Sequence, residues 1–290
     1  MYTDINGKKR QKVALHLHTT LSDGSCTPNE VIASYKEQGF DAVALTDHWK
    51  YGEAGIVDGT TVISGAEYNL GHATEKGVYH IVGLFMKRDP EVLKKDTTQE
   101  IIDKIHSVNG LAVLAHPAWS LNTPEMILSL RDIDATEIYN AVSEKGQSFR
   151  PDSSLIVDML ASRGVEYPLL ATDDAHYYDG DQMRGITMLE ADAVEELGVA
   201  GAIKAGRFYS TQGPEIHLEQ VSEKRFRVRC TPVSKIVFLS NLPWAPNRVQ
   251  KGDGLTEAYF DLDPRGYETF LRAEVTDRDG RCGWSNIIML

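Results

Sequence analysis

The sequence predicts an α/β protein followed by a smaller all-β part. Up to about residue 212, short apolar runs rich in Val, Ile, Leu and Ala alternate with amphipathic helices. Such near-continuous apolar runs suit strands that are buried on both faces, as in parallel sheets. From residue 213 onward, apolar residues instead alternate with polar ones at every second position. This pattern indicates a small antiparallel β domain of the sandwich type at 213–290, after a first domain at 1–212.

Eight strands are expected in the first part, at 13–18, 41–46, 61–67, 78–85, 111–116, 135–139, 167–172 and 185–190. Helices are expected between several of them, because their starts are visible. Thr27-Pro28-Asn29-Glu30 is a capping box with proline at the first helical position, and Gly39 ends that helix. Similar starts lie at 97, 123, 153 and 192. Repeated β-then-α units imply a parallel sheet, either open or closed into a barrel.

The second part shows the period of two in several runs. Phe226, Val228 and Cys230 are interleaved with arginines, and a similar run covers 271–276. Turn signals at 241–243, 252–254, 263–266 and 277–280 separate these runs, and no helix is expected among them.

Composition limits the functional classes. The 290 residues include 42 acidic and 30 basic ones, and a net charge of −12 disfavours a nucleic-acid polymer as the main partner. Three scattered cysteines do not indicate a disulfide framework. The polar start lacks the apolar segment of a signal peptide, and no run is long enough to span a membrane. We therefore expect a cytoplasmic protein without a membrane partner, and nothing in the sequence indicates its oligomeric state.

Polar side chains end six of the expected strands. His16 and His18 end the first, where alternate residues share a face, and Asp47-His48 ends the second. Later strand ends carry Glu67, His116, Asn140 and Asp173-Asp174-Ala175-His176. Active sites of parallel α/β folds are assembled at the carboxyl edge of the sheet, so we expect these side chains to lie together. His80 belongs to the same set but fits it least well, because it sits early in its strand.

Imidazoles and carboxylates gathered at one edge indicate a metal site. Nine side chains are candidate ligands: His16, His18, Asp23, His48, Glu67, His80, His116, Asp174 and His176. One ion takes about four to six ligands, so we expect two or three divalent transition-metal ions (zinc, manganese or iron) with a bridging carboxylate. Such a cluster serves in-line displacement at phosphorus, with metal-bound hydroxide as the nucleophile. No serine or cysteine nucleophile is then needed, and none is apparent.

These motifs resemble those of the polymerase and histidinol phosphatase (PHP) family. The resemblance covers about residues 12–212 and rests on five motifs in order: His16-Leu17-His18 with Ser22-Asp23-Gly24, Thr46-Asp47-His48, Gly65-Ala66-Glu67, Ala115-His116-Pro117 and Asp173-Asp174-Ala175-His176. It implies a distorted seven-stranded β/α barrel with a di- or trinuclear site and phosphoesterase activity. Residues 206–214 and the end Gly283-Trp284-Ser285-Asn286 resemble a subgroup with a C-terminal sandwich.

The resemblance also implies three groups of ligands. The first is His16, His18, Glu67 and Asp174; the second is Glu67, as a bridge, with His80 and His116; the third is Asp23, His48 and His176. Glu67, Asp174 and His176 are the residues expected to carry catalysis. Two positions depart from the simplest pattern, since Asp23 stands where some members have histidine and Asp173 where serine or asparagine is more usual.

Three further residues are candidate substrate contacts. Asn140 could hydrogen-bond the substrate or a metal-bound water, or it could only cap its strand. Arg184 could clamp a phosphate through two hydrogen bonds or form an ordinary salt bridge at the rim. Arg207 could contact a phosphate, although a tie between its helix end and the second domain is the simpler interpretation.

The sequence therefore predicts metal-dependent hydrolysis of a small phosphate ester. A phosphodiesterase or nuclease using the same site is the nearest alternative. A binding module on a degenerate barrel is another, but the candidate ligands are intact at every motif. Metal-dependent C–N hydrolysis of the amidohydrolase type ranks below these, since no lysine lies at a strand end where a carbamylated bridge would be expected.

Overall fold

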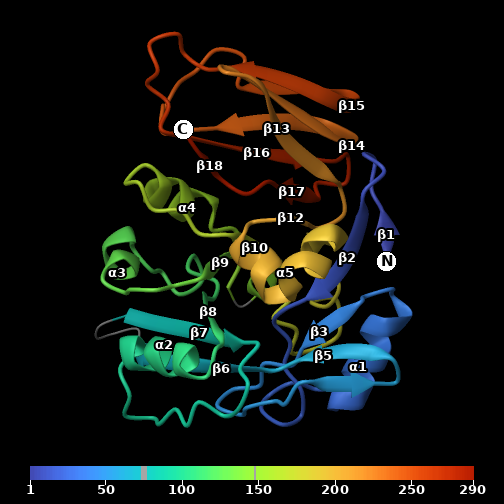
Figure 1. Cartoon of the computed structure of the whole chain (residues 1–290), viewed down its shortest axis with the longest axis vertical. Helices are drawn as coiled ribbons and strands as arrows, with labels where there is room; N and C mark the ends of the chain where they lie inside the picture. Colours follow the sequence, from blue (N-terminus) through green and yellow to red (C-terminus); the bar gives the residue numbers. More distant parts are fainter. Residues whose placement is uncertain (73–76, 147) are drawn as a thin grey trace.

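Two β-sheets form the framework of the computed structural model (Figure 1). The structure describes residues 1–72, 77–146 and 148–290. The larger sheet has thirteen strands and extends from the C-terminal part into the first part, whereas the smaller sheet has five strands and belongs to the first part alone. None of the helices in the described ranges has the length and hydropathy that a membrane span requires.

The first part contributes strands to both sheets. Those in the larger sheet are β1 (Tyr2–Thr3), β2 (Lys9–Ala14), β3 (Ala42–Ala44), β4 (Gly55–Val57), β5 (Thr60–Ile63), β11 (Ile186–Glu190) and β12 (Phe208–Thr211). The smaller sheet consists of β6 (Gly65–His72), β7 (Gly77–Leu84), β8 (Leu111–Leu114), β9 (Ala135–Asn140) and β10 (Leu169–Thr172). Parallel pairing joins β2, β3 and β5, and likewise β8, β9 and β10. By contrast, β7 is antiparallel to both β6 and β8.

The two sheets meet through single bridges just beyond their parallel strands. Leu17, after β2, pairs with Ala175, after β10, and His48, after β3, pairs with Glu67 in β6. The chain passes from one sheet to the other at Ser64, between β5 and β6. The implied closed barrel of seven strands is therefore not confirmed, because the structure holds two open sheets joined by these bridges.

Five α-helices cover the sheets in the described ranges: α1 (Pro28–Glu37), α2 (Thr98–Ser107), α3 (Pro124–Leu128), α4 (Ser154–Ala161) and α5 (Ala191–Lys204), with a 3₁₀ turn, η1, at Val142–Glu144. A capping box forms at the start of α1, as predicted, and another at the start of α2. In each, the threonine side chain (Thr27 or Thr97) accepts from the backbone N–H of the glutamate three residues on, and the threonine backbone N–H donates to that glutamate's carboxylate. Gly39 follows α1 with a φ of 76°, a left-handed conformation that costs glycine little.

The C-terminal part consists of strands without a helix, as predicted. They are β13 (Ile216–Ser222), β14 (Arg225–Leu239), β15 (Val249–Asp261), β16 (Phe270–Thr276), β17 (Cys282–Trp284) and β18 (Ile288–Met289). The alternation also holds, since Phe226, Val228 and Cys230 are buried. However, β17 pairs with β12, so these strands continue the sheet of the first part. A separate sandwich is not confirmed, and the domain boundary at 213 stays a prediction.

The strand bounds differ from the expected ones in two places that matter for the site. First, β2 ends at Ala14, so His16 and His18 follow the strand rather than end it. Second, the single strand expected at 61–67 is β5 plus the start of β6, in different sheets. The break is at Ser64. Its hydroxyl donates to the backbone oxygen of Met86, and its backbone oxygen accepts from the backbone nitrogen of Phe85.

A buried arginine ties the C-terminal part to the first part. Arg272 in β16 is fully buried, although the alternation of its strand predicts an exposed side chain. Its guanidinium donates to both carboxylate oxygens of Asp158 in α4, at 2.5 and 2.8 Å, and to Glu274 at 2.5 Å. Ser154, at the start of α4, donates to the same Glu274. Both carboxylates therefore compensate the cost of burying this charge.

We predict that Asp158→Ala destabilises the protein by about 3–5 kcal/mol, because it leaves a buried guanidinium with half of its charge compensation. Equilibrium urea unfolding measures the change. Arg278→Ala is the matched control, since Arg278 is exposed, with only a 4.0 Å contact to Asp279, and it should behave like wild type. Equal stability of the two variants would contradict the role assigned to Asp158.

Candidate metal centre

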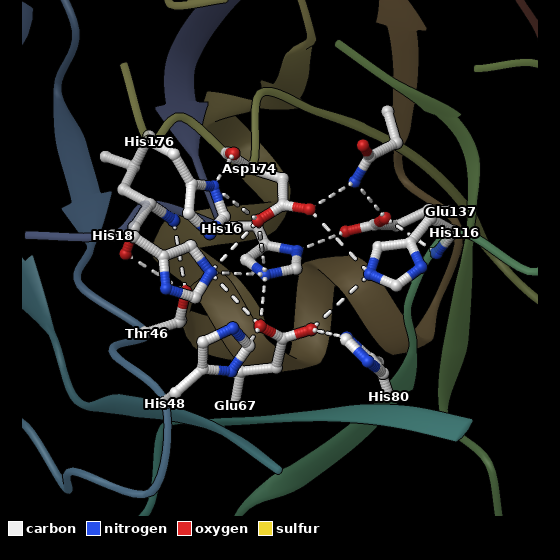
Figure 2. Close-up of polar contacts among 12 residues, drawn as sticks. His16, His18, Thr46, His48, Glu67, His80, His116, Glu137, Asp174 and His176 are labelled. Atoms are coloured by element: carbon white, nitrogen blue, oxygen red, sulfur yellow. Dashed lines mark hydrogen bonds and ion pairs between the residues drawn. The ribbon is translucent and has the colours of Figure 1, made fainter. Parts of the chain in front are cut away.

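Glu67 lies at the centre of the candidate site (Figure 2). It belongs to β6, directly after the crossing between the sheets, and its side chain is buried. Both carboxylate oxygens face imidazoles. Oε2 lies 3.1–3.4 Å from nitrogens of His16, His18 and His48, and Oε1 lies 2.7 Å from His80 Nδ1 and 3.4 Å from His116 Nε2. Five histidines thus surround one carboxylate, which separates them into two sides.

The histidines reach Glu67 because strand ends from both sheets converge on it. The bridge between Leu17 and Ala175 aligns the segment after β2 with the segment after β10, and backbone hydrogen bonds from Asp174 to His16 and from His18 to Ala175 hold them together. His80 reaches the site because of the direction of its strand, which the sequence does not show. Because β7 runs antiparallel to β8, the start of β7 lies beside the end of β8, where His116 follows.

The first group has the spacing of ligands around one ion. His16 Nε2, His18 Nε2, Glu67 Oε2 and Asp174 Oδ1 lie 3.0–3.4 Å apart in the five pairs with a measured separation. Ligands at about 2.0–2.1 Å from a tetrahedral ion would be about 3.3 Å from one another. All four residues are buried. Their atoms already stand close to the positions that one metal ion requires.

Two further groups share members with the first. Glu67, His80 and His116 place ligand atoms within 4.8 Å of one another, and so do His18, Asp23, His48 and His176. The third group is the most open, since the side chain of Asp23 is 55% exposed and lies 3.5–3.7 Å from its histidine neighbours. The structure thus brings all nine predicted ligands together, in the same three groups that the resemblance implies, with His18 added to the third.

Unpaired buried atoms at the centre support a bound cation. Among the residues that the structure describes, Glu67 Oε2, Asp174 Oδ1 and His48 Nδ1 are buried without a hydrogen-bond partner. A buried polar atom without a partner costs free energy, and a carboxylate oxygen more so. Nitrogen and carboxylate donors are the set that zinc, manganese or iron binds. The residues present therefore fit a cluster of divalent ions.

The charges of the cluster shift the pKa values of its members. Burial lowers the pKa of His48 to about 4, which leaves a neutral imidazole at pH 7. Burial acts the same way on His18, but the carboxylates of Asp174 and Glu67 outweigh it and raise the pKa of His18 to about 9. Burial raises the pKa of both carboxylates, but the neighbouring histidines lower it by more than burial raises it. Glu67 and Asp174 are therefore ionised. Ionised carboxylates are the form that binds metal.

Glu137 is the main residue of the site that the sequence motifs do not indicate. It is buried in β9, where one oxygen lies 2.7 Å from His16 Nδ1 and the other accepts from the backbone nitrogen of His116 at 2.8 Å and from Asn140 at 2.8 Å. Contact with Nδ1 directs Nε2 of His16 toward the first ligand group. A lone glutamate inside the apolar run 135–139 was the available signal.

Two aspartates next to predicted ligands organise the backbone instead. Asp47 accepts from the backbone and hydroxyl of Thr19 and from Ser22, which shapes the loop after β2. Asp173 accepts from the Tyr35 hydroxyl and from the backbone nitrogens of 183–185, so its carboxylate is engaged away from the cluster. Burial raises the pKa of Asp173 to about 6.

The three candidate substrate contacts have other partners. Asn140 is fully buried, donates to Glu137 and to Asp174, and accepts from Ser143, so it positions Asp174 and caps its strand. Arg184 pairs with Glu144. Arg207 pairs with Glu190, which lies beside Arg10 at the start of β2, whereas His16 follows the end of that strand. About six residues of strand, or roughly 20 Å, separate Arg207 from the cluster, so it is not a contact of this site.

One aromatic residue outside the motifs lies against the second ligand group. The indole of Trp119 packs edge-on to the rings of His80 and His116, with centroids 5.4 and 5.0 Å away. It fixes the outer side of both imidazoles while remaining 37% exposed.

Comparison with known families agrees with this geometry. The family model for the PHP domain matches residues 14–150. This chain contains a PHP domain. The matched region carries seven of the nine candidate ligands, and Asp174 and His176 follow it in sequence. No curated protein matches the chain in sequence.

Solved structures include one with the same two-part arrangement. A two-domain protein from Bacteroides vulgatus, described as containing a predicted PHP-like metal-dependent phosphoesterase, aligns with a TM-score of 0.56 at 15% identity over 99% of this chain and 96% of its own. A metal-dependent phosphoesterase candidate from Bifidobacterium adolescentis aligns at 0.44 (13% identity, 67% and 98% coverage), and an amidohydrolase from Chromobacterium violaceum at 0.41 (16% identity, 58% and 89%). The first supports the fold of a PHP domain with a second, strand-rich part.

We predict that the purified protein, expressed with ample metal, carries at least two transition-metal ions per chain, and that Glu67→Gln loses at least one of them. The reason is that both carboxylate oxygens of Glu67 face imidazoles and could each hold an ion, whereas the amide of glutamine offers a single neutral oxygen. Elemental analysis measures the content. Glu125→Gln, on the exposed face of α3, is the control and should match wild type. One ion or fewer in the wild-type protein would contradict the cluster.

We also predict that Glu137→Gln weakens metal binding about 10- to 100-fold, the usual effect of removing a residue that orients a ligand. An amide cannot accept from His16, the backbone of His116 and Asn140 together, so one of these contacts is lost. Competition with a chelator measures the affinity, and Glu125→Gln again serves as the control. Wild-type affinity in Glu137→Gln would show that His16 is oriented without it.

Proposed function

We propose that this protein is a metal-dependent hydrolase of small phosphate esters, with two or three divalent ions held by the nine candidate ligands. One observation carries the proposal: both oxygens of the buried Glu67 face separate sets of histidines, the arrangement of a carboxylate between two ions. Paired ions are suited to displacement at phosphorus, because they stabilise both the attacking and the leaving oxygen. When bound, they would also lower the pKa of a water molecule.

The three ligand groups differ in how deeply they are buried, and this difference indicates their roles. The first two groups are buried and hold their atoms in place, with Glu137 orienting His16 and Asn140 orienting Asp174. The third group includes the exposed Asp23 and the partly exposed His48 and His176. The substrate would therefore approach on this side. The ring nitrogen Nδ1 of His176 contacts the backbone oxygen of Asp174, which turns Nε2 toward Asp23 and the opening.

The charge of the protein favours a small substrate. With a net charge of −12, the surface repels a long polyanion, whereas metal ions attract a single phosphate at short range. Arg184, the one candidate clamp near the rim, is occupied by Glu144. A phosphodiesterase or nuclease on the same site is the second candidate, since the metal chemistry would serve it equally. A degenerate, purely binding barrel is disfavoured because all nine ligand side chains converge.

Location and partners complete the proposal. Cys26, Cys230 and Cys282 are all free in the structure, which is consistent with the expected cytoplasmic protein. The proposed partner is the small phosphorylated substrate alone, with neither a membrane nor a nucleic-acid polymer required.

We expect kcat/KM to be far higher for a mononucleotide or sugar phosphate than for an oligonucleotide, with little loss as salt rises. Screening over about 10 Å at 0.1 M salt leaves a buried metal–phosphate contact largely intact. Steady-state kinetics on both substrates at two salt concentrations measure this. Glu67→Gln should lower the rate on the order of a thousandfold, and Glu125→Gln should not. A strong preference for the polymer that salt abolishes would favour the nuclease instead.

A further inference from the structure

A cavity of about 690 Å³ lies at the junction of the two parts, away from the metal centre. Its walls come from the β1–β2 turn, the end of α5 with the start of β12, the strands β13 and β14, and residues 285–288. In Figure 1, β1 and β2 extend from the first part toward β14. No candidate metal ligand lines this cavity, and Arg10 on its wall lies at the opposite end of β2 from His16. Its volume is that of a site for a small organic molecule.

The walls are cationic in a protein that is acidic overall. Five of the described lining residues are basic and three are acidic; the basic ones are Lys8, Arg10, Lys204, Arg207 and Arg229. Cations concentrated in a partly enclosed space attract anions more strongly than the same charges spread over the surface. The charge of the cavity wall is therefore opposite in sign to the net charge of the protein, −12.

Internal ion pairs do not neutralise these cations completely. Glu190 is shared by three of them, with Arg207 in direct contact, Arg10 at 3.6 Å and Lys8 at 3.8 Å. Asp4 compensates Arg10 at 2.7 Å, and Asp134 pairs with Lys204 at 2.9 Å. The guanidinium of Arg229, on β14, makes no hydrogen bond or ion pair with any residue that the structure describes. The guanidinium of a half-buried arginine without a partner can donate two hydrogen bonds to the oxygens of a carboxylate or phosphate.

We propose that this cavity is a second binding site, which takes a small organic anion through its phosphate or carboxylate group, with Arg229 as the principal contact and Arg207, which also pairs with Glu190, as a second contact. The planar guanidinium binds either group through two parallel hydrogen bonds. The remaining volume would hold the organic part of the ligand between the first part and the C-terminal strands. A bound ligand would then contact both parts of the protein, because Arg10 and Arg207 belong to the first part and Arg229 to the C-terminal part.

Hydrogen–deuterium exchange of the metal-loaded, full-length protein tests this site, with inorganic phosphate and, separately, succinate as probes. Because phosphate also binds metal ions, the exchange is followed by peptide. At least one probe should protect residues 204–209 and 216–219, and this protection should need about tenfold to a hundredfold more probe in Arg229→Gln, the loss of a charged hydrogen bond. Protection by phosphate around 115–122 and 172–178, at the metal centre, should not change.

Arg225→Gln is the matched control, since Arg225 lies on the same strand but is exposed and pairs with Asp261 outside the cavity. Arg207→Gln is a second cavity variant, and thermal unfolding checks that each variant folds like wild type. If neither probe protects the cavity peptides in wild type, or if Arg229→Gln and Arg207→Gln both respond at wild-type concentrations, the site does not exist. Either result leaves the proposed hydrolase untouched, because the metal centre is measured by other peptides.

Discussion

The cost of burying two carboxylates beside five imidazoles dominates the structure of the first part. Glu67 and Asp174 are both buried and ionised, and each has an oxygen without a hydrogen-bond partner. A buried carboxylate without compensation would destabilise the fold by several kcal/mol. Neighbouring histidines outweigh the effect of burial and keep both carboxylates ionised, and divalent ions, which the donor set fits, would take the place of the histidine protons. Folding and metal binding are therefore linked.

The rest of the scaffold serves to hold these charged groups in one place. Two sheets meet through the pairs Leu17–Ala175 and His48–Glu67, and both bridges involve or flank candidate ligands. Glu137 and Asn140, on a third strand end, then set the orientation of His16 and Asp174. Strand ends can converge in this way without a closed barrel, because each bridge needs only one pair of residues.

The two ends of β2 have opposite electrostatic character. Past its carboxyl end lie the carboxylates of the candidate metal centre, and at its amino end lie Arg10 and the cationic cavity at the junction. The buried Arg272 adds a third charged element, which fastens β16 to α4. The C-terminal strands are thus joined to the first part by a shared sheet, by an ion pair and by the cavity wall, so a ligand there would contact both parts.

The sequence by itself determined the chemistry of the site: the donor types, their positions near strand ends, the capped helices and the alternation of the last strands. These follow from local rules, since a cap or a period of two involves residues a few positions apart. Only the tertiary structure decided which ends meet. The antiparallel direction of β7 brings His80 to the site, the turn at Ser64 divides one expected strand between two sheets, and Glu137 contacts a histidine 121 positions away. Strand pairing likewise places Arg207 near the start of β2, whereas the candidate metal ligands follow the other end of that strand. Pairing direction and register depend on contacts between distant segments, and no local pattern encodes them.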